Sequence, residues 1–356
     1  MSGRGSRVQK ASLSALHFAG LDNLAATLTR GTGAILSFHH VLPAAPMAFA
    51  PNRHLEVTPE FLDRTVRLVL ERGYHVISLD EARGRLAEGD FDRPFICFTF
   101  DDGYRDVLQH AHPVFKRYEQ PFAVFVAADF ADGCGAIWWR ALEHLLRVVD
   151  AVELKIDGVQ QRFSCRRPAA KRRAYKVICR WLENLPEHDA REVVAGLCHR
   201  YDVDVSGLCG ELAMGWDEIR QLACDPLVTV GAHTRRHVPL GQLSYAEARA
   251  EIHESCARIA RETGRPCRHF SFPEGGDGPR EFELAREAGL ATALTSRNGL
   301  LKPHHGAALD ALPRITLSGE LQKLRYVKVM LSGAPFALSR TAERLALRHP
   351  SAAAPA

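Results

Sequence analysis

Residues 95–100, Phe-Ile-Cys-Phe-Thr-Phe, are followed directly by Asp101-Asp102-Gly103. A short segment that is apolar on both faces predicts a strand covered on both sides, as in parallel sheets flanked by helices. The same rhythm of short apolar segments and amphipathic stretches recurs along the chain. It predicts further strands at 34–38, 75–79, 122–126, 228–230, 269–272 and 291–295, with helices at 12–30, 59–72, 80–86, 105–118, 244–263 and 279–288. Repeated strand–helix units predict an α/β fold built on a parallel sheet or barrel.

One long segment interrupts this rhythm, residues 138–215. Alternating apolar residues lead up to Asp157-Gly158, which is typical of a β-hairpin, and two helical stretches follow at 169–184 and 187–201. We therefore predict a mostly helical insertion at 138–215 carried on a barrel that spans 34–332. An N-terminal helical segment (1–33) precedes the barrel, and a C-terminal helix and tail (333–356) follow it.

Composition excludes several classes of protein. The 356 residues contain 46 Lys and Arg against 42 Asp and Glu, so the formal charge of 46 − 42 = +4 is too small to indicate nucleic-acid binding. No apolar run is long enough for a transmembrane span, and the N-terminus makes a poor secretory signal. We expect a cytoplasmic protein. A basic patch at 166–173 is typical of a solvated helix start, and contact with a membrane surface stays open.

Two polar motifs follow predicted strands. Asp101 and Asp102 lie at the carboxyl end of their strand, where α/β folds build their sites. A solvated turn is the alternative, but two adjacent carboxylates repel each other and favour a nearby cation. His233 and His237 follow the strand at 228–230, and on one helical turn their i, i+4 spacing would place both imidazoles on one face. Two histidines with one carboxylate are a frequent ligand set for a divalent metal.

Two further segments stand at strand ends. Residues 273–276, Pro-Glu-Gly-Gly, predict a turn with exposed backbone N–H groups that could bind an oxyanion, although an ordinary βα loop has the same composition. His39 ends the first predicted strand.

Taken together and in this order, Thr99-Phe100-Asp101-Asp102-Gly103 and His233-Thr-x-x-His237 resemble the polysaccharide deacetylases of the nodulation-protein-B type. The resemblance covers most of residues 34–332, apart from the insertion. It implies a distorted (β/α) barrel that hydrolyses N-acetyl groups from GlcNAc-type sugars with a bound divalent metal, usually Zn²⁺.

The resemblance also implies roles for individual residues. Asp101 matches the general base, and the backbone N–H of Glu274 matches the oxyanion donor. The metal ligands are matched by Asp102, His233 and His237. The family's late Leu-x-His, which supplies the general acid, is not evident.

The chain is instead similar to a circularly permuted branch in which the acid-bearing strand comes first. His39 is then the predicted acid, with His40 as the alternative. Where the family usually has an orienting arginine, this chain has Ser271, and we predict that Arg314 in Leu312-Pro313-Arg314-Ile315 takes its place.

Other functions stay open on the sequence alone. A metal-independent glycoside hydrolase would use Asp101 with Asp102 or Glu274. A two-histidine–one-carboxylate oxygenase is a weaker alternative, and a non-catalytic carbohydrate-binding relative is a third. The expected partner is an N-acetylated glycan, and a lipid-linked glycan is not excluded. Trp138-Trp139 could stack on a sugar or anchor the insertion. The sequence leaves the oligomeric state open.

Overall fold

The computed structural model describes residues 3–20, 29–45, 47–273 and 276–338. Within these residues, seven parallel strands close into a barrel in the order β1-β12-β11-β10-β9-β6-β5 and back to β1. They are β1 (Gly33–Phe38), β5 (Phe95–Phe100), β6 (Phe122–Val126), β9 (Val228–Ala232), β10 (His269–Ser271), β11 (Thr292–Asn298) and β12 (Leu312–Thr316). The predicted α/β barrel is therefore confirmed.

The first strand closes the barrel. β1 pairs with β5 along its whole length, from Gly33 opposite Phe95 to Phe38 opposite Phe100, and its other edge pairs with β12. The other edge of β5 pairs with two strands. Its last residues pair with β6, and its first residues pair with the short strand β4 (His75–Val76). The strand predicted at 75–79 was too long, since the Ser78 hydroxyl caps helix α5 (Leu79–Glu88) by accepting the Glu81 N–H.

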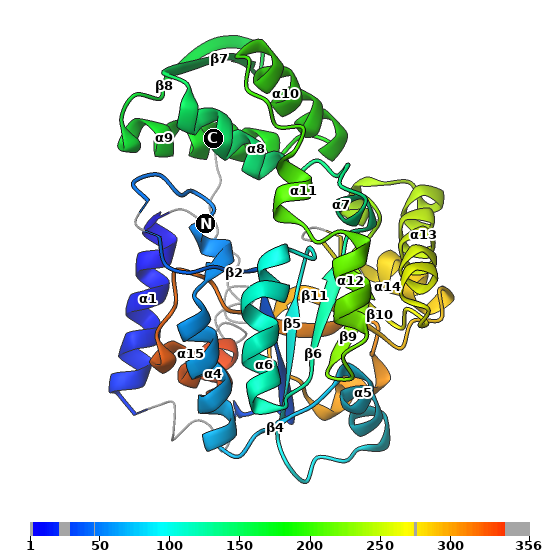
Figure 1. Cartoon of the computed structure of the whole chain (residues 1–356). Coiled ribbons are helices and arrows are strands. Elements are labelled where there is room, and N and C mark those ends of the chain that lie inside the picture. Colours follow the sequence, from blue (N-terminus) through cyan, green and yellow to red (C-terminus); the bar gives the residue numbers. More distant parts are fainter. Residues whose placement is uncertain (1–2, 21–28, 46, 274–275, 339–356) are drawn as a thin grey trace, which may run out of the picture.

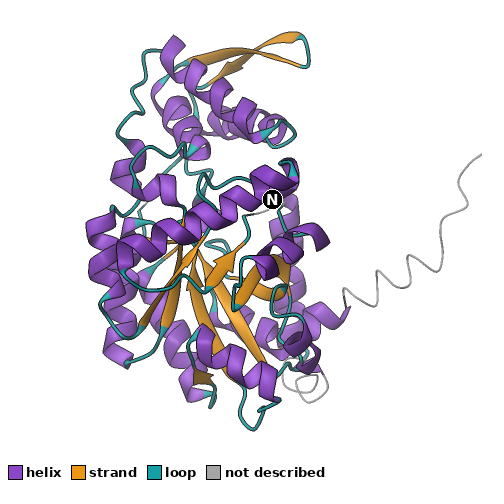
Figure 2. Ribbon diagram, turned by 90° about the vertical axis from the view of Figure 1, so that its right-hand side faces the viewer, coloured by secondary structure: helices purple, strands orange, loops and turns teal. Residues whose placement is uncertain are grey.

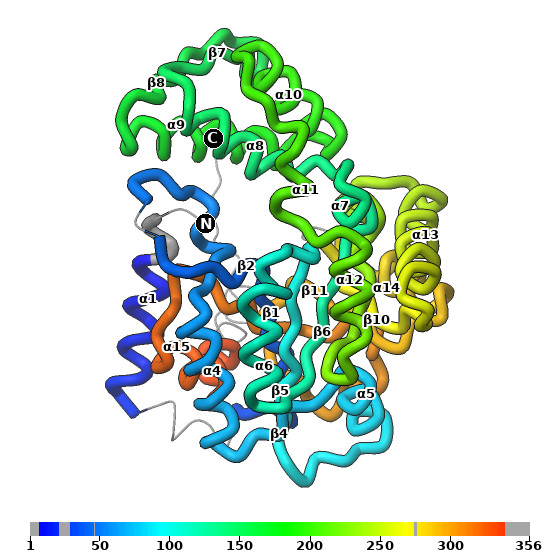
Figure 3. Tube along the Cα trace, in the orientation of Figure 1, coloured from blue at the N-terminus to red at the C-terminus, as the bar shows by residue number. Residues whose placement is uncertain are grey.

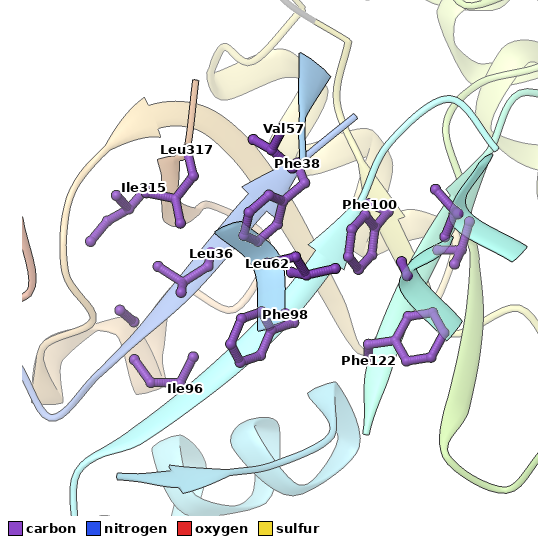
Figure 4. Close-up of a cluster of buried hydrophobic side chains, with 14 of the residues drawn as sticks. Leu36, Phe38, Val57, Leu62, Ile96, Phe98, Phe100, Phe122, Ile315 and Leu317 are labelled. Atoms are coloured by element: carbon purple, nitrogen blue, oxygen red, sulfur yellow. The ribbon is translucent and has the colours of Figure 1, made fainter. Parts of the chain in front are cut away.

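Side chains alternate between the inside of the barrel and the layer of helices around it. Along β5, Phe95 and Cys97 belong to an apolar cluster shared with Ile35, Phe125, Leu294 and Leu312, which fills the barrel. Ile96, Phe98 and Phe100 face the other way, into the larger cluster beneath the helices (Figure 4). Burying each such phenylalanine stabilises the fold by roughly 1.5–3 kcal/mol. This alternation also decides which polar residues at the strand ends point inward.

Helices surround the barrel on its outer face (Figure 2). The outer elements include α4 (Pro59–Glu71), α6 (His112–Tyr118), α12 (Trp216–Ala223), α13 (Tyr245–Thr263), α14 (Pro279–Glu287) and α15 (Leu324–Ser332). The start of α4 is as expected: Thr58 caps it by accepting the Phe61 N–H, and Pro59 occupies the first turn. The predicted helix at 105–118 is helical throughout but contains a π-helical turn at Val107–Ala111, just before Pro113.

The chain between β6 and β9 leaves the barrel and builds a second apolar core of its own. It contains α8 (Trp138–Val148), the hairpin β7 (Ala151–Ile156) and β8 (Val159–Ser164), α9 (Pro168–Leu182), α10 (Glu187–Arg200) and α11 (Leu208–Leu212). The predicted hairpin and both predicted helices are confirmed. This unit lies at the end of the barrel opposite β4, and therefore over the carboxyl ends of the strands (Figure 1).

The N-terminal helix differs from its prediction. α1 spans Gly3–Phe18, earlier than the expected 12–30, and lies beside α15 (Figure 3). Residues 21–28 and most of the predicted C-terminal helix and tail, residues 339–356, lie outside the described residues. In the described part of the chain, no helix is both long and apolar enough to cross a bilayer.

Candidate active site

Strand alternation directs four polar side chains to the inside of the barrel mouth. Asp101 continues the inward series of Cys97 and Thr99, and Arg314 continues that of Leu312. His233 follows Gly231, whose lack of a side chain makes room for the Phe125 ring inside the barrel, because a Cβ there would lie 2.6 Å from that ring. His39 continues the inward-facing series of Ile35 and Ser37. Four strands that are distant in sequence thus contribute side chains to the same end of the barrel.

Asp102 breaks the alternation because its backbone is left-handed, with φ 73°. Its side chain is buried, and its Oδ1 lies 3.4 Å from His233 Nε2 and 3.1 Å from His237 Nε2. The Nδ1 of His233 lies 2.7 Å from the Ser271 carbonyl oxygen and donates to it, since a carbonyl can only accept. This hydrogen bond leaves the Nε2 lone pair of His233 facing Asp102.

These three side chains fit a divalent metal. One ligand atom from each of Asp102, His233 and His237 lies within 4.8 Å of the others. The Asp102 Oδ1 atom is buried, and among the described residues it receives no hydrogen bond of acceptable geometry. A buried carboxylate oxygen and two imidazole nitrogens that converge without hydrogen bonding to one another form a donor set that suits a divalent cation.

The two histidines meet in a way that the sequence did not indicate. Residues 233–237 are a loop and not a helical turn. Thr234 and His237 both adopt left-handed backbone conformations with φ 59°, each of which costs about 1–2 kcal/mol for a residue other than glycine. The i, i+4 spacing was a correct indication of proximity, but a sharply bent loop produces it.

Asp101 lies beside the proposed ligands and is held by a cation. Arg314 Nη1 donates to Asp101 Oδ1 over 2.8 Å, and Arg314 Nε donates to the Thr295 carbonyl over 3.0 Å. Burial alone would raise the pKa of Asp101, but the Arg314 guanidinium and the nearby His233 outweigh it and hold that pKa below its ordinary value. Asp101 is therefore ionised at neutral pH.

The Asp102 carboxylate is ionised as well. Burial opposes its charge, but His237 and His233 hold the pKa of Asp102 well below its ordinary value. The same contacts act on His233: burial lowers its pKa, and the two carboxylates outweigh burial and raise it.

The adjacent residues His39 and His40 have different environments. His39 is half-buried, and the carboxylates of Asp102 and Asp101 partly offset the burial that lowers its pKa. His40 points away from the barrel interior and is fully buried. Its Nδ1 lies 2.6 Å from Asp106 Oδ2, and its ring stacks on Tyr104 with centroids 3.5 Å apart. Of the two, His39 is the one whose charge acts on the carboxylate pair.

Two aromatic rings also reach the site, Phe130 before the insertion and Trp139 within it, and the sequence left open whether the Trp138-Trp139 pair meets a sugar or anchors the insertion. The Trp139 ring lies 5.1 Å from the ring of His237, and the Phe130 ring stacks on His237 at 5.5 Å. Trp138 packs edge-on against Trp139 at 5.8 Å. Nothing in the spacing of Phe130 or Trp139 signalled this contact, although the aromatic pair itself was visible. Glu274, the predicted oxyanion donor, lies outside the described residues.

Comparison with known proteins gives a family match over part of the chain. The family model described as polysaccharide deacetylase matches residues 170–293, a range that contains both histidines but not Asp101, Asp102 or Arg314. No curated protein matches the chain significantly.

Solved structures share the barrel. The Streptococcus pyogenes deacetylase PplD, solved with acetate, is similar with a TM-score of 0.56 at 15% identity, over 83% of this chain and 97% of that one. IcaB from Ammonifex degensii has a TM-score of 0.52 at 17% identity, over 85% and 97%. BC0361, a polysaccharide deacetylase from Bacillus cereus, has a TM-score of 0.52 at 14% identity, over 84% and 68%.

At these identities the structures establish the fold, and the family model adds a resemblance that is limited to residues 170–293. The acid and imidazole side chains of the motifs stand together at the mouth of that fold. The chain is therefore similar to the polysaccharide deacetylases, by the family model over residues 170–293 and by its barrel fold, and both findings support a hydrolase of non-peptide carbon–nitrogen bonds.

Proposed function

We propose that this enzyme removes N-acetyl groups from a GlcNAc-containing oligo- or polysaccharide, with a divalent metal, most readily Zn²⁺, held by Asp102, His233 and His237. The observation that carries the proposal is the convergence of these three ligand atoms within 4.8 Å beside an ionised Asp101. Two imidazoles and one carboxylate leave coordination positions for water and substrate.

A metal in this position would lower the pKa of a bound water and polarise the acetyl carbonyl. The chain's own residues supply the rest. Asp101, oriented by Arg314, accepts the proton of the attacking water. As the carbon–nitrogen bond breaks, His39 donates a proton to the departing amine. The products are acetate and a free amino sugar. The backbone N–H of Glu274 is the proposed additional donor to the oxyanion.

Metal-independent glycoside hydrolysis is less compatible with the electrostatics. A glycosidase requires one carboxyl group that stays protonated near neutral pH. In this site the pKa values of both Asp101 and Asp102 lie below their ordinary values, because cations or imidazoles contact each carboxylate. Neither group is suited to be a general acid at neutral pH.

The deciding experiment combines metal analysis with acetate release. Purified enzyme is assayed on chitooligosaccharides and on acetylated exopolysaccharides, before and after treatment with a chelator, and then with Zn²⁺ restored. We expect acetate release that the chelator abolishes and Zn²⁺ restores. Glycosidic cleavage that survives chelation would instead support a glycoside hydrolase. Glycan binding without any acetate release would support a non-catalytic relative.

A further inference from the structure

The loop that carries both histidines has a conformation that must be held from outside. It contains no glycine, and two of its residues, Thr234 and His237, are left-handed. Such residues persist only where surrounding contacts over-determine the backbone. If the loop relaxed, His237 would move away from His233 and Asp102, because these two come from strand ends and His237 does not.

A buried carboxylate provides much of that restraint. Glu251, in the second turn of α13, places Oε2 against the two backbone N–H groups at the centre of the loop. Oε2 accepts from the Arg235 N–H over 2.9 Å and from the Arg236 N–H over 3.0 Å. The other oxygen, Oε1, accepts from the side-chain Nε of Arg236 over 2.5 Å.

The opposite side of the loop is held by backbone contacts. The Thr234 and Arg235 carbonyls accept from the N–H groups of Ala128 and Asp129, which begin the short helix α7 (Ala128–Ala131). The Thr234 hydroxyl accepts from the Val238 N–H over 3.2 Å. The loop is therefore fixed between α7 and Glu251. Arg191 also donates to the Arg236 carbonyl, and Glu251 is the carboxylate that accepts from the loop's backbone N–H groups.

Glu251 is a buried carboxylate, so a role at the protein surface does not explain it. It is only 3% exposed, and a carboxylate at such a depth is unfavourable unless donors compensate it. Its three donors all belong to the loop between the two histidines, and no described metal-ligand atom contacts it. Its position is explained if it acts on the loop.

We propose that Glu251 is a positioning residue that sets the metal affinity of the site by holding His237 in register with His233 and Asp102. The residue does not bind the metal itself. This inference rests on the proposed metal site and assigns the restraint that organises it.

The test compares Glu251→Gln with Glu254→Gln as a matched control. Glu254 is three residues further along the same helix, is half-exposed, and pairs with Arg235 at 3.2 Å. Its substitution removes the same charge near the same loop but leaves both amide hydrogen bonds in place. The Zn²⁺ dissociation constants of the full chain are measured by competition with a chromophoric chelator, and the unfolding of the metal-free proteins is followed by circular dichroism.

We expect Glu251→Gln to weaken Zn²⁺ binding by about 10- to 100-fold, the usual effect of losing an outer-shell partner. Glu254→Gln should stay within about threefold of wild type, which is smaller than that outer-shell effect. Glu251→Ala should weaken binding further, and if it fails to fold, the glutamine variant decides alone.

A folded Glu251→Gln protein with wild-type Zn²⁺ affinity would overturn the inference and leave the metal site intact, even if its metal-free form were less stable. Wild-type protein that binds no divalent metal would overturn the proposed function itself, and this inference with it.

Discussion

The guanidinium of Arg314 and the carboxylate of Asp101 form an ion pair of 2.8 Å between residues 213 positions apart in the chain. Their strands, β12 and β5, are not neighbours in the barrel, because β1 lies between them. Both side chains point inward and meet across the barrel mouth. This pair is compatible with the proposed role of Arg314, on β12, in orienting Asp101.

The pair predicts a change in pH dependence. Arg314 lowers the pKa of Asp101, and a general base must be deprotonated, so a lowered pKa extends activity toward acid pH. Arg314→Gln should raise that pKa and shift the acidic limb of kcat/KM to higher pH. The profile is measured by acetate release across pH, and Arg314→Lys, which keeps the charge, should shift it less. An unmoved acidic limb in Arg314→Gln would contradict the role.

We expect Asp101 to accept the proton of the attacking water and not to bind the metal. Asp101→Asn should lower kcat by about 10²–10⁴-fold, the usual contribution of a general base, while bound metal stays at the wild-type level. Acetate release and elemental analysis on the same preparation check both parts. Near-normal turnover would reject the assignment.

His237 is expected to be a metal ligand. His237→Ala should weaken Zn²⁺ binding by more than about 100-fold, beyond the effect of an outer-shell change, and should also abolish acetate release. His54→Ala is a suitable control, since His54 contacts the Pro51 carbonyl on another loop. Retention of stoichiometric zinc by His237→Ala after dialysis would exclude it as a ligand.

Substitutions at the two adjacent histidines should have different effects, one on turnover and the other on thermal stability. His39→Gln should lower kcat by about 10²–10⁴-fold with little change in melting temperature. His40→Gln should lower the melting temperature, because it breaks the contact with Asp106 and leaves that carboxylate buried. Parallel thermal melts and assays test this, and the reverse pattern would make His40 the acid.

A buried ionic network should stabilise the insertion. Glu143 accepts hydrogen bonds from Asn52, Arg140 and Arg147, and its side chain is only 4% exposed. Glu143→Gln removes the buried charge that Arg140 and Arg147 share, while Arg140 keeps its pair with Glu56. It should cost about 1–3 kcal/mol of unfolding free energy. Urea denaturation measures this.

A matched control is Glu153→Gln, which breaks an exposed pair with Arg162 and should cost at most about 1 kcal/mol. Equal effects of the two substitutions would show that the buried network contributes no more than a surface pair.

The strand–helix rhythm was readable because each barrel strand carries a dense apolar pattern and each helix has strong end signals, as with Thr58-Pro59. Prediction was weaker where tertiary contacts override local sequence. β4 has only two residues because Ser78 caps the next helix. The histidine loop is not helical, because Glu251 and α7 hold its backbone in another conformation.

From the order of its residues alone, the chain determined which side chains stand at the ends of apolar strands, since hydrophobic patterning and the two-residue repeat of a strand are local properties. That was enough for the barrel and for the choice of Asp101, Asp102, His233 and His237. Only the closed tertiary structure decided that Arg314 reaches Asp101, that His39 faces inward while His40 faces outward, and that Trp139 of the insertion packs on His237. These are contacts between distant segments, and they depend on how β1 closes the barrel and where the insertion lies, which no local pattern encodes.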